Sequence, residues 1–166
     1  FICGLLSKIV PKKIIYCSEK SKNFHENKHL YSKKKSNLIY NGFSDKNYYF
    51  SKELRFKFRK KNKRNKSDII FGYAGRYARQ KNLPSLLIAF SKISKLYNNL
   101  FLYMAGKDIN ENNNELIKLI EKLKIKNKVY LLNEQNNLVE FYNGIDLLVL
   151  TSHSESFPNV LAESML

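Results

Sequence analysis

Residues 68–97 read DIIFGYAGRYARQKNLPSLLIAFSKISKLY, and this stretch decides the fold class. It opens with an apolar segment, 68–75, that ends in glycine, which is typical of a buried strand. After a polar turn, apolar residues recur at three- to four-residue spacing over 83–97, with Pro84 in the first turn, so an amphipathic helix is expected there. The stretch therefore predicts one strand–turn–helix unit.

The same unit recurs along the rest of the chain. Further strands are expected at 100–106, 128–133 and 146–152, and further helices at 114–124, at 138–145 and from Phe157 onward. Strands that are apolar throughout and alternate with helices are typical of a parallel sheet covered on both faces. Right-handed crossovers place every strand-to-helix loop at one edge of the sheet, where ligands bind in open α/β folds. We therefore expect an α/β fold with a doubly wound parallel sheet.

The first 43 residues have a similar but shorter pattern. Strands are expected at 12–18 and at 37–43, the second closing on an Asn-Gly turn, with a polar helix between them that Ser18 caps. The first ten residues, FICGLLSKIV, are too few to span a membrane, and we expect them to be buried in the protein. Cys3 and Cys17 have no metal-ligand spacing, which fits a reducing compartment.

The net charge of +16 suggests a polyanionic partner, but it has a second explanation. The chain also holds twenty asparagines and abundant Ile, Tyr and Lys, which is the composition of a protein from a low-GC genome. Residues 52–66 (KELRFKFRKKNKRNK) carry nine Lys or Arg and one Glu. They show no hydrophobic periodicity, so we expect 44–67 to be a basic connector. Three alternatives remain open for it: a solvated linker, a patch facing an anionic membrane, or a nucleic-acid contact, although two phenylalanines are too few for a base-stacking platform.

Charged side chains follow the first and the last strand of the repeating pattern. The loop after 68–75 carries Arg76 and Lys81, whereas the loop after 146–152 carries Glu155 and leads to Glu163 in the next helix. Arginine and lysine suit phosphate oxygens, and an ionised carboxylate accepts hydrogen bonds from a pair of sugar hydroxyls. Because these loops share one edge of the sheet, the pattern predicts a nucleotide, or a nucleotide joined to a sugar, as the ligand.

Several segments resemble one enzyme family. The segment HSESFPNVLAE is similar to the E-x7-E signature of the retaining family-4 glycosyltransferases, whose GT-B fold pairs two Rossmann-like domains. GYAGRYARQKNLPSLLIAF resembles the first strand and helix of that family's C-terminal domain, and FYNGIDLLVLTS resembles the segment ahead of the two glutamates. YCSEKSKNFH and NLIYNGF resemble the end of the N-terminal domain. The resemblance implies the end of an N-terminal, acceptor-side domain over 1–43, the basic connector over 44–67 and a truncated nucleotide-sugar-binding domain over 68–166.

The resemblance assigns roles to the charged residues of the two loops. Arg76 and Lys81 match the residues that hold the donor diphosphate. The next residue, Asn82, departs from the family, which more often has glycine there. Glu155 matches the first glutamate, which faces the donor sugar and is the catalytic candidate. Glu163 matches the second, which is expected on the ribose diol.

The remaining donor-binding candidates lie between the two glutamates. Backbone N–H groups of Ser156, Phe157 and Asn159 are expected to lie against the sugar and the phosphate. No metal-ligand cluster is visible in the sequence, and the resemblance implies no metal and no cofactor, with the nucleotide sugar acting as a substrate.

The expected protein is a retaining glycosyltransferase that moves a hexose-type sugar from a nucleotide-sugar donor to a saccharide or lipid-linked acceptor in cell-surface polysaccharide synthesis. We expect it in the cytoplasm or peripherally on the inner face of the membrane, with 52–66 as the candidate contact to anionic lipid and with no nucleic-acid partner. Residues 1–166 alone are expected to be inactive. The alternatives are a non-catalytic relative that binds nucleotide sugars, and a basic adaptor for a membrane or for nucleic acid.

Overall fold

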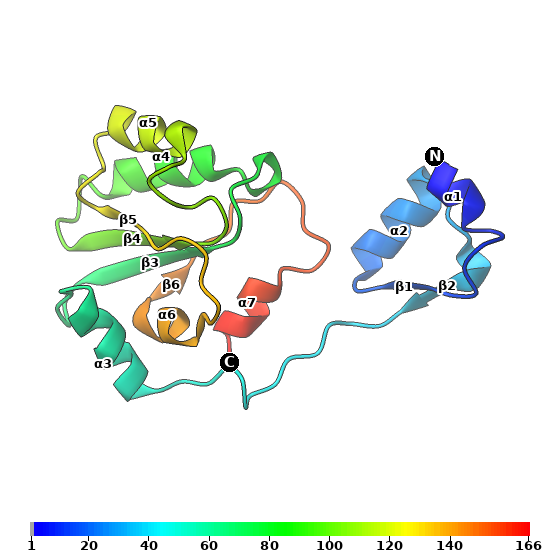
Figure 1. Cartoon of the computed structure of the whole chain (residues 1–166), viewed down its shortest axis with the longest axis horizontal. Helices are drawn as coiled ribbons and strands as arrows, with labels where there is room; N and C mark the ends of the chain where they lie inside the picture. Colours follow the sequence, from blue (N-terminus) through cyan, green and yellow to red (C-terminus); the bar gives the residue numbers. More distant parts are fainter. Residues whose placement is uncertain (1) are drawn as a thin grey trace. The chain divides into compact units, whose positions relative to one another are not determined.

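A computed structural model describes residues 2–166 and divides them into two units, each of which is described by itself. The first unit contains the residues up to Phe43 together with Glu155–Asn159. The second contains Ser44–Ser154 and Val160–Leu166. Figure 1 labels the helices and strands of both.

The first unit is built around a two-stranded parallel sheet. Its elements are α1 (Ile2–Leu6), β1 (Ile14–Tyr16), α2 (Glu19–Lys28), the 3-10 turn η1 (Lys33–Lys35) and β2 (Ser36–Leu38). β1 and β2 pair in parallel with Ile14 opposite Ser36. The hydroxyl of Ser18 accepts a hydrogen bond from the N–H of Ser21 at 3.2 Å, which is the N-cap that the sequence predicts for α2.

Two expectations for this unit are wrong. β2 ends at Leu38, well before the predicted end at residue 43. The apolar start of the chain is not buried: Gly4 is the one buried residue of α1, and the side chains of Ile2 and Ile9 are 74% and 81% exposed. A sheet of two three-residue strands offers too little surface to cover these side chains.

The second unit contains a four-stranded parallel sheet with the strand order β5-β4-β3-β6. Its elements are α3 (Lys52–Lys61), β3 (Ile69–Ala74), the 3-10 turn η2 (Arg79–Lys81), α4 (Leu83–Ile93), β4 (Leu100–Ala105), α5 (Asn114–Lys122), β5 (Val129–Leu131), α6 (Val139–Gly144), β6 (Leu147–Leu148) and α7 (Asn159–Ser164), of which Asn159 belongs to the first unit. All neighbouring strands are parallel, with Ile69 opposite Leu100 and Phe71 opposite Leu147. The predicted doubly wound parallel sheet is therefore confirmed.

Helices cover both faces of this sheet, as Figure 1 shows. Tyr73 and Leu102 point to the face that α4 and α5 cover, and each is fully buried. Ile70 and Tyr103 point to the opposite face, where they pack with residues of α3 and α6. Successive strand residues thus enter opposite cores, which explains why the strands are apolar without alternation.

The helix α3 replaces the irregular connector that the sequence suggested. Ser51 caps it by accepting a hydrogen bond from the N–H of Leu54 at 3.2 Å, and both Phe58 and Arg59 are buried. It packs closely against α6, because a Cβ at Gly144 would collide with the ring of Phe58. The buried side of α3 is narrow and includes an arginine, which is why no apolar periodicity is visible in 52–66.

The strand predicted over 146–152 is also shorter in the structure. β6 comprises Leu147–Leu148, and the N–H of Val149 extends the pairing by donating to the carbonyl of Gly72 at 2.8 Å. In the described residues β6 pairs with β3 alone, so it has the exposure of an edge strand, and Leu147 is half exposed. Among the described residues, no helix has both the length and the apolar character needed to cross a lipid bilayer.

Candidate functional site

The strand order fixes where a ligand site is expected in the second unit. From β3 the chain proceeds to β4 and β5 on one side, and it then crosses to β6 on the other side. Ligands of open α/β sheets bind beyond the carboxyl ends of the strands, at the point where the strand order reverses. The loops that follow β3 and β6 flank that point.

The loops after β3 and β4 approach each other through glycine. Gly75 and Gly106 have φ values of +154° and +145°, which glycine adopts without a steric penalty. A Cβ at Gly106 would collide with the carbonyl oxygen of Gly75. The N–H of Tyr77 donates to the carbonyl of Lys107 at 2.9 Å, so the two loops are held side by side.

The predicted phosphate-binding cations lie on the loop after β3. Arg76 is exposed at its start, and its carbonyl accepts a hydrogen bond from the hydroxyl of Tyr73 at 3.2 Å. Lys81 is half buried at the end of η2. The following Asn82 has φ 51° and ψ 46°, a left-handed conformation that glycine and asparagine both tolerate. Its backbone thus accounts for the departure from glycine at this position.

The loop after β6 is attached to the loop that carries these cations. The hydroxyl of Thr151 lies 3.2 Å from the carbonyl oxygen of Lys81 and 3.0 Å from that of Asn82. The N–H of His153 donates to the carbonyl of Gln80 at 2.9 Å, and the side-chain amide of Gln80 donates to the carbonyl of Ser154. The chain is therefore fixed beside Lys81 as far as the residue before Glu155.

The next five residues, Glu155–Asn159, belong to the first unit. Within that unit the ring of Phe157 stacks on Phe43, with centroids 5.8 Å apart and planes 21° apart. The side-chain oxygen of Asn159 accepts a hydrogen bond from Asn41 at 2.7 Å, and its N–H donates to the carbonyl of Phe157 at 3.1 Å. Glu155 is half buried and Ser156 is exposed. The predicted donor-binding residues are thus divided between the two units.

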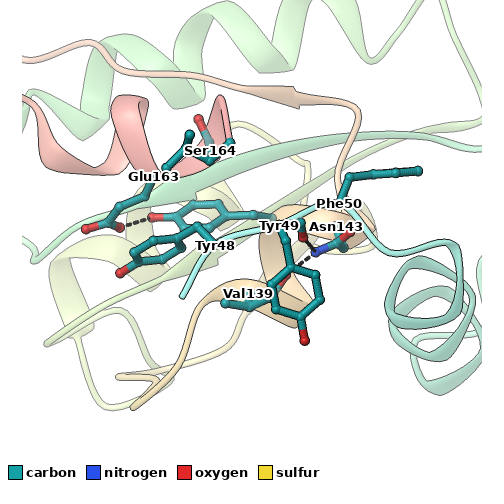
Figure 2. A pocket seen from close by; sticks show the side chains of 9 residues that line it. Tyr48, Tyr49, Phe50, Val139, Asn143, Glu163 and Ser164 are labelled. Atoms are coloured by element: carbon teal, nitrogen blue, oxygen red, sulfur yellow. Dashed lines mark hydrogen bonds between the residues drawn. The ribbon is translucent and has the colours of Figure 1, made fainter. Parts of the chain in front are cut away.

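Glu163 lies on α7 in the second unit, where it contacts a tyrosine of α6. Its Oε2 accepts a hydrogen bond from the hydroxyl of Tyr142 at 2.7 Å. Figure 2 shows Glu163 beside Tyr48, which comes from the segment ahead of α3. A cavity of about 60 Å³ adjoins these side chains, and it is also lined by Tyr49, Phe50, Val139, Asn143, Ser164 and Leu166.

The environment of Tyr142 keeps its hydroxyl protonated. Burial is the main cause that raises the pKa of Tyr142 above its ordinary value, and the hydrogen bond to Glu163 and its charge raise it further. Burial also raises the pKa of Tyr48, with a smaller contribution from Glu163. Both phenols therefore face the carboxylate as neutral groups that can donate hydrogen bonds.

A buried amide holds the chain that leads into this cavity. The side-chain oxygen of Asn143 accepts a hydrogen bond from the N–H of Ser51 at 2.6 Å. Its amide nitrogen donates to the carbonyls of Tyr49, at 3.0 Å, and of Val139, at 2.9 Å (Figure 2). The sequence suggests only a helix cap or turn at Asn143, but the residue links α6 to the segment that carries Tyr48.

The sequence alone gives no sign of three contributors to this region. Tyr142 and Tyr48 look like ordinary aromatic residues, and Thr151 looks like the end of an apolar strand. A polar tip on a half-buried aromatic side chain is the one available signal for Tyr142, because a buried phenol needs a partner. In the described part of the chain, His, Cys, Asp and Glu form no group of three or more that could hold a metal ion. The expectation of a metal-free site stays a prediction.

Comparison with known proteins shows the family. The sequence model described as "Glycosyl transferases group 1" matches residues 55–166. The chain is 33% identical, over 100 residues, to an uncharacterized glycosyltransferase of Methanocaldococcus jannaschii, covering 60% of this chain and 24% of that protein. It is 26% identical, over 130 residues, to the O-antigen biosynthesis glycosyltransferase WclY of Escherichia coli, covering 78% of this chain and 35% of WclY.

The fold has a similar counterpart among solved structures. The crystal structure of Anabaena HepE in complex with UDP-glucose matches 99% of this chain and 45% of HepE, with a TM-score of 0.85 and 21% sequence identity. Such a likeness shows the fold, which is of the GT-B type. The chain spans less than half the length of each of these proteins.

Proposed function

The chain belongs to the group 1 glycosyltransferases, and from this premise we propose that it supplies the donor-binding part of a retaining hexosyltransferase. The proposed enzyme moves a hexose-type sugar from a nucleotide-sugar donor to a saccharide or lipid-linked acceptor. Its setting is cell-surface polysaccharide synthesis in the cytoplasm. WclY, which is named for O-antigen biosynthesis, and HepE, which was crystallised with UDP-glucose, support this choice of pathway and donor class.

One structural observation carries the proposal. Thr151 bonds to the backbone of Lys81 and Asn82, and it thereby joins the loop after β6 to the loop after β3. These two loops flank the point where the strand order reverses, which is the nucleotide-binding edge of open α/β sheets. The loop that carries Arg76 and Lys81 is thus in the right place to receive a diphosphate.

Arg76 and Lys81 are proposed to act on the departing nucleotide. As the bond between sugar and phosphate breaks, negative charge accumulates on the diphosphate. A planar guanidinium and a mobile ammonium group that already face those oxygens stabilise that charge without reorganisation. They should therefore contribute to the rate as well as to donor affinity.

Glu155 is proposed to act on the sugar. The family resemblance places the leaving group and the incoming hydroxyl on the same face of the ring, so the configuration is retained. A carboxylate beside the anomeric carbon stabilises the positive charge that develops there, and in this role it orients the sugar without attacking it. Backbone N–H groups of Ser156 and Phe157 are the proposed contacts to the sugar hydroxyls. The N–H of Asn159 bonds locally to the carbonyl of Phe157, and it would have to leave that bond to serve the donor.

Glu163 is proposed to bind the ribose of the nucleotide. An ionised carboxylate accepts hydrogen bonds through both oxygens, which suits two neighbouring hydroxyls. Its Oε2 is held by Tyr142, so the carboxylate has a defined orientation before the donor arrives. Such preorganisation reduces the entropic cost of binding.

Calorimetry and turnover on the full-length protein test the proposal. We expect one class of nucleoside diphosphate to bind, and the corresponding nucleotide sugar to be consumed with a product of retained configuration. Binding without any turnover on a broad acceptor panel would favour a non-catalytic relative. Binding of polyanions that collapses steeply with salt, with no nucleotide affinity, would favour a basic adaptor.

A further inference from the structure

The two sides of α3 have different kinds of basic residue. On the side that faces the protein, Arg55 and Arg59 donate to Asp146 at 2.5 and 2.6 Å. Just after the helix, the guanidinium of Arg64 lies 3.8 Å from the ring centroid of Phe101 and donates to the hydroxyl of Tyr103 at 3.0 Å. These arginine charges are used inside the fold.

The outward side of α3 carries lysines around an exposed aromatic ring. Lys52, Phe56 and Lys60 follow one another at four-residue spacing, so they form one ridge along the helix. The side chain of Phe56 is 63% exposed, and Nζ of Lys60 lies 5.8 Å from the centroid of its ring. Lys61, Lys63 and Lys66 are exposed nearby. We call Lys52, Phe56, Lys60, Lys61, Lys63 and Lys66 the α3 patch.

The patch is hollowed and almost free of acids. A groove of about 570 Å³ is lined by Arg55, Arg59, Arg64, Asn65 and four members of the patch, with no acidic residue in its wall. A second hollow on the other side of Phe56 includes one acid, Glu53. Of the lysines on α3, Lys57 alone has an ion pair in the described residues, to Glu140 at 3.0 Å. The remaining lysine charges face solvent.

We propose that the α3 patch docks the protein on an anionic lipid bilayer. The lysines would contact phosphate and carboxylate groups of the lipid headgroups, and Phe56 would enter the boundary between headgroups and acyl chains, as apolar residues of interfacial helices do. An exposed phenylalanine within a ring of lysines gains nothing in water but suits this interface. Nucleic acid fits less well, because a single exposed ring cannot stack successive bases. The proposal does not depend on the proposed transferase activity.

Vesicle sedimentation of the full-length protein tests it. The vesicles are phosphatidylcholine alone, or phosphatidylcholine with about 30% phosphatidylglycerol, which supplies the anionic surface. The test variant carries Lys52→Gln, Lys60→Gln, Lys61→Gln and Lys66→Gln. The matched control carries four exposed lysines of α4, α5 and the α4 terminus as glutamine: Lys92, Lys95, Lys118 and Lys122. Both variants have the same net charge.

We expect the test variant to lose at least about 100-fold in partition onto anionic vesicles, and the control to lose less than about fivefold. Phe56→Ala should lose about tenfold although it keeps every charge. Equal losses in the test and control variants would overturn the proposal, since the binding would then follow total charge. Failure of the unchanged protein to bind would overturn it too, as would a loss of RNA affinity in the test variant without a loss of vesicle binding.

Discussion

The hydroxyl of Tyr142 and the Oε2 atom of Glu163 are 2.7 Å apart, which joins α6 to α7 by a charge-assisted hydrogen bond. Glu163 is the residue proposed to bind the ribose, so this contact gives Tyr142 an indirect part in donor recognition. Tyr142 positions the carboxylate and does not itself need to touch the donor. The contact also ties donor recognition to α6, on which Asn143 holds the segment ahead of α3.

Tyr142→Phe should weaken nucleotide binding. Removal of the hydroxyl frees the carboxylate to rotate, so we expect the Kd for the nucleoside diphosphate to rise about three- to tenfold in the full-length protein, in line with about 1 kcal/mol for one hydrogen bond. The KM for the donor should rise in parallel while kcat at saturation changes little. Tyr130→Phe is the matched control, since it removes a phenol that bonds to Arg64 instead. Unaltered nucleotide affinity in Tyr142→Phe would show that the bond is purely structural.

The same tyrosine should make the fold sensitive to alkali. Burial and Glu163 raise the pKa of Tyr142 in the folded state above its ordinary value near 10. The unfolded chain therefore releases this proton first, so the stabilising contribution is complete below about pH 10 and declines as the pH rises further. We expect urea midpoints to fall above that pH, and to fall less steeply in Tyr142→Phe. Tyr97→Phe, which changes an exposed phenol, should keep the wild-type slope. Identical slopes in all three proteins would refute this assignment.

Asp146 should be the most sensitive charge in the second unit. Its Oδ2 accepts hydrogen bonds from the buried Arg59 at 2.6 Å and from the N–H of Ile70 at 2.7 Å, while Oδ1 pairs with Arg55. Asp146→Ala leaves Arg59 buried without its counter-charge, which costs about 3–5 kcal/mol of unfolding free energy. Glu121→Gln, which removes an exposed pair with Lys126, should cost less than about 1 kcal/mol. Urea unfolding compares the two, and similar losses would contradict the proposed role of the buried pair.

Long, uniformly apolar strands made the sheet predictable from the sequence. Segments such as 68–75 and 100–106 are buried on both faces, so their pattern states their environment directly. The helix α3 could not be read in this way, because its buried Arg59 depends on Asp146, which is 87 residues away in the chain. Sequence patterns describe local periodicity, and they do not show which distant carboxylate neutralises a buried arginine.

The candidate site was predictable to a similar, limited degree. Charged residues that follow strands could be assigned to one edge of the sheet, since parallel strands point the same way. The contacts that hold them could not, because Thr151 and Tyr142 bond to groups on other loops and helices. Such contacts follow from packing and carry no spacing of their own.

The two glutamates of the motif should respond differently to substitution. Ribose is present both in the free nucleoside diphosphate and in the sugar donor, so Glu163→Gln should weaken both by about ten- to a hundredfold, as expected for a lost charge-assisted bond of about 1.5–3 kcal/mol. Glu155→Gln should leave nucleoside diphosphate affinity nearly unchanged and lower kcat, because its proposed partner is the sugar, where positive charge develops in the transition state. Calorimetry with the nucleoside diphosphate, beside turnover of the donor by the full-length protein, separates the two roles. Glu115→Gln is a control on α5, where the carboxylate accepts a hydrogen bond from Tyr77 at 3.1 Å. If Glu155→Gln loses nucleotide affinity while Glu163→Gln keeps it, the two assignments are reversed, and if neither variant differs from the control, the two glutamates do not form the donor site.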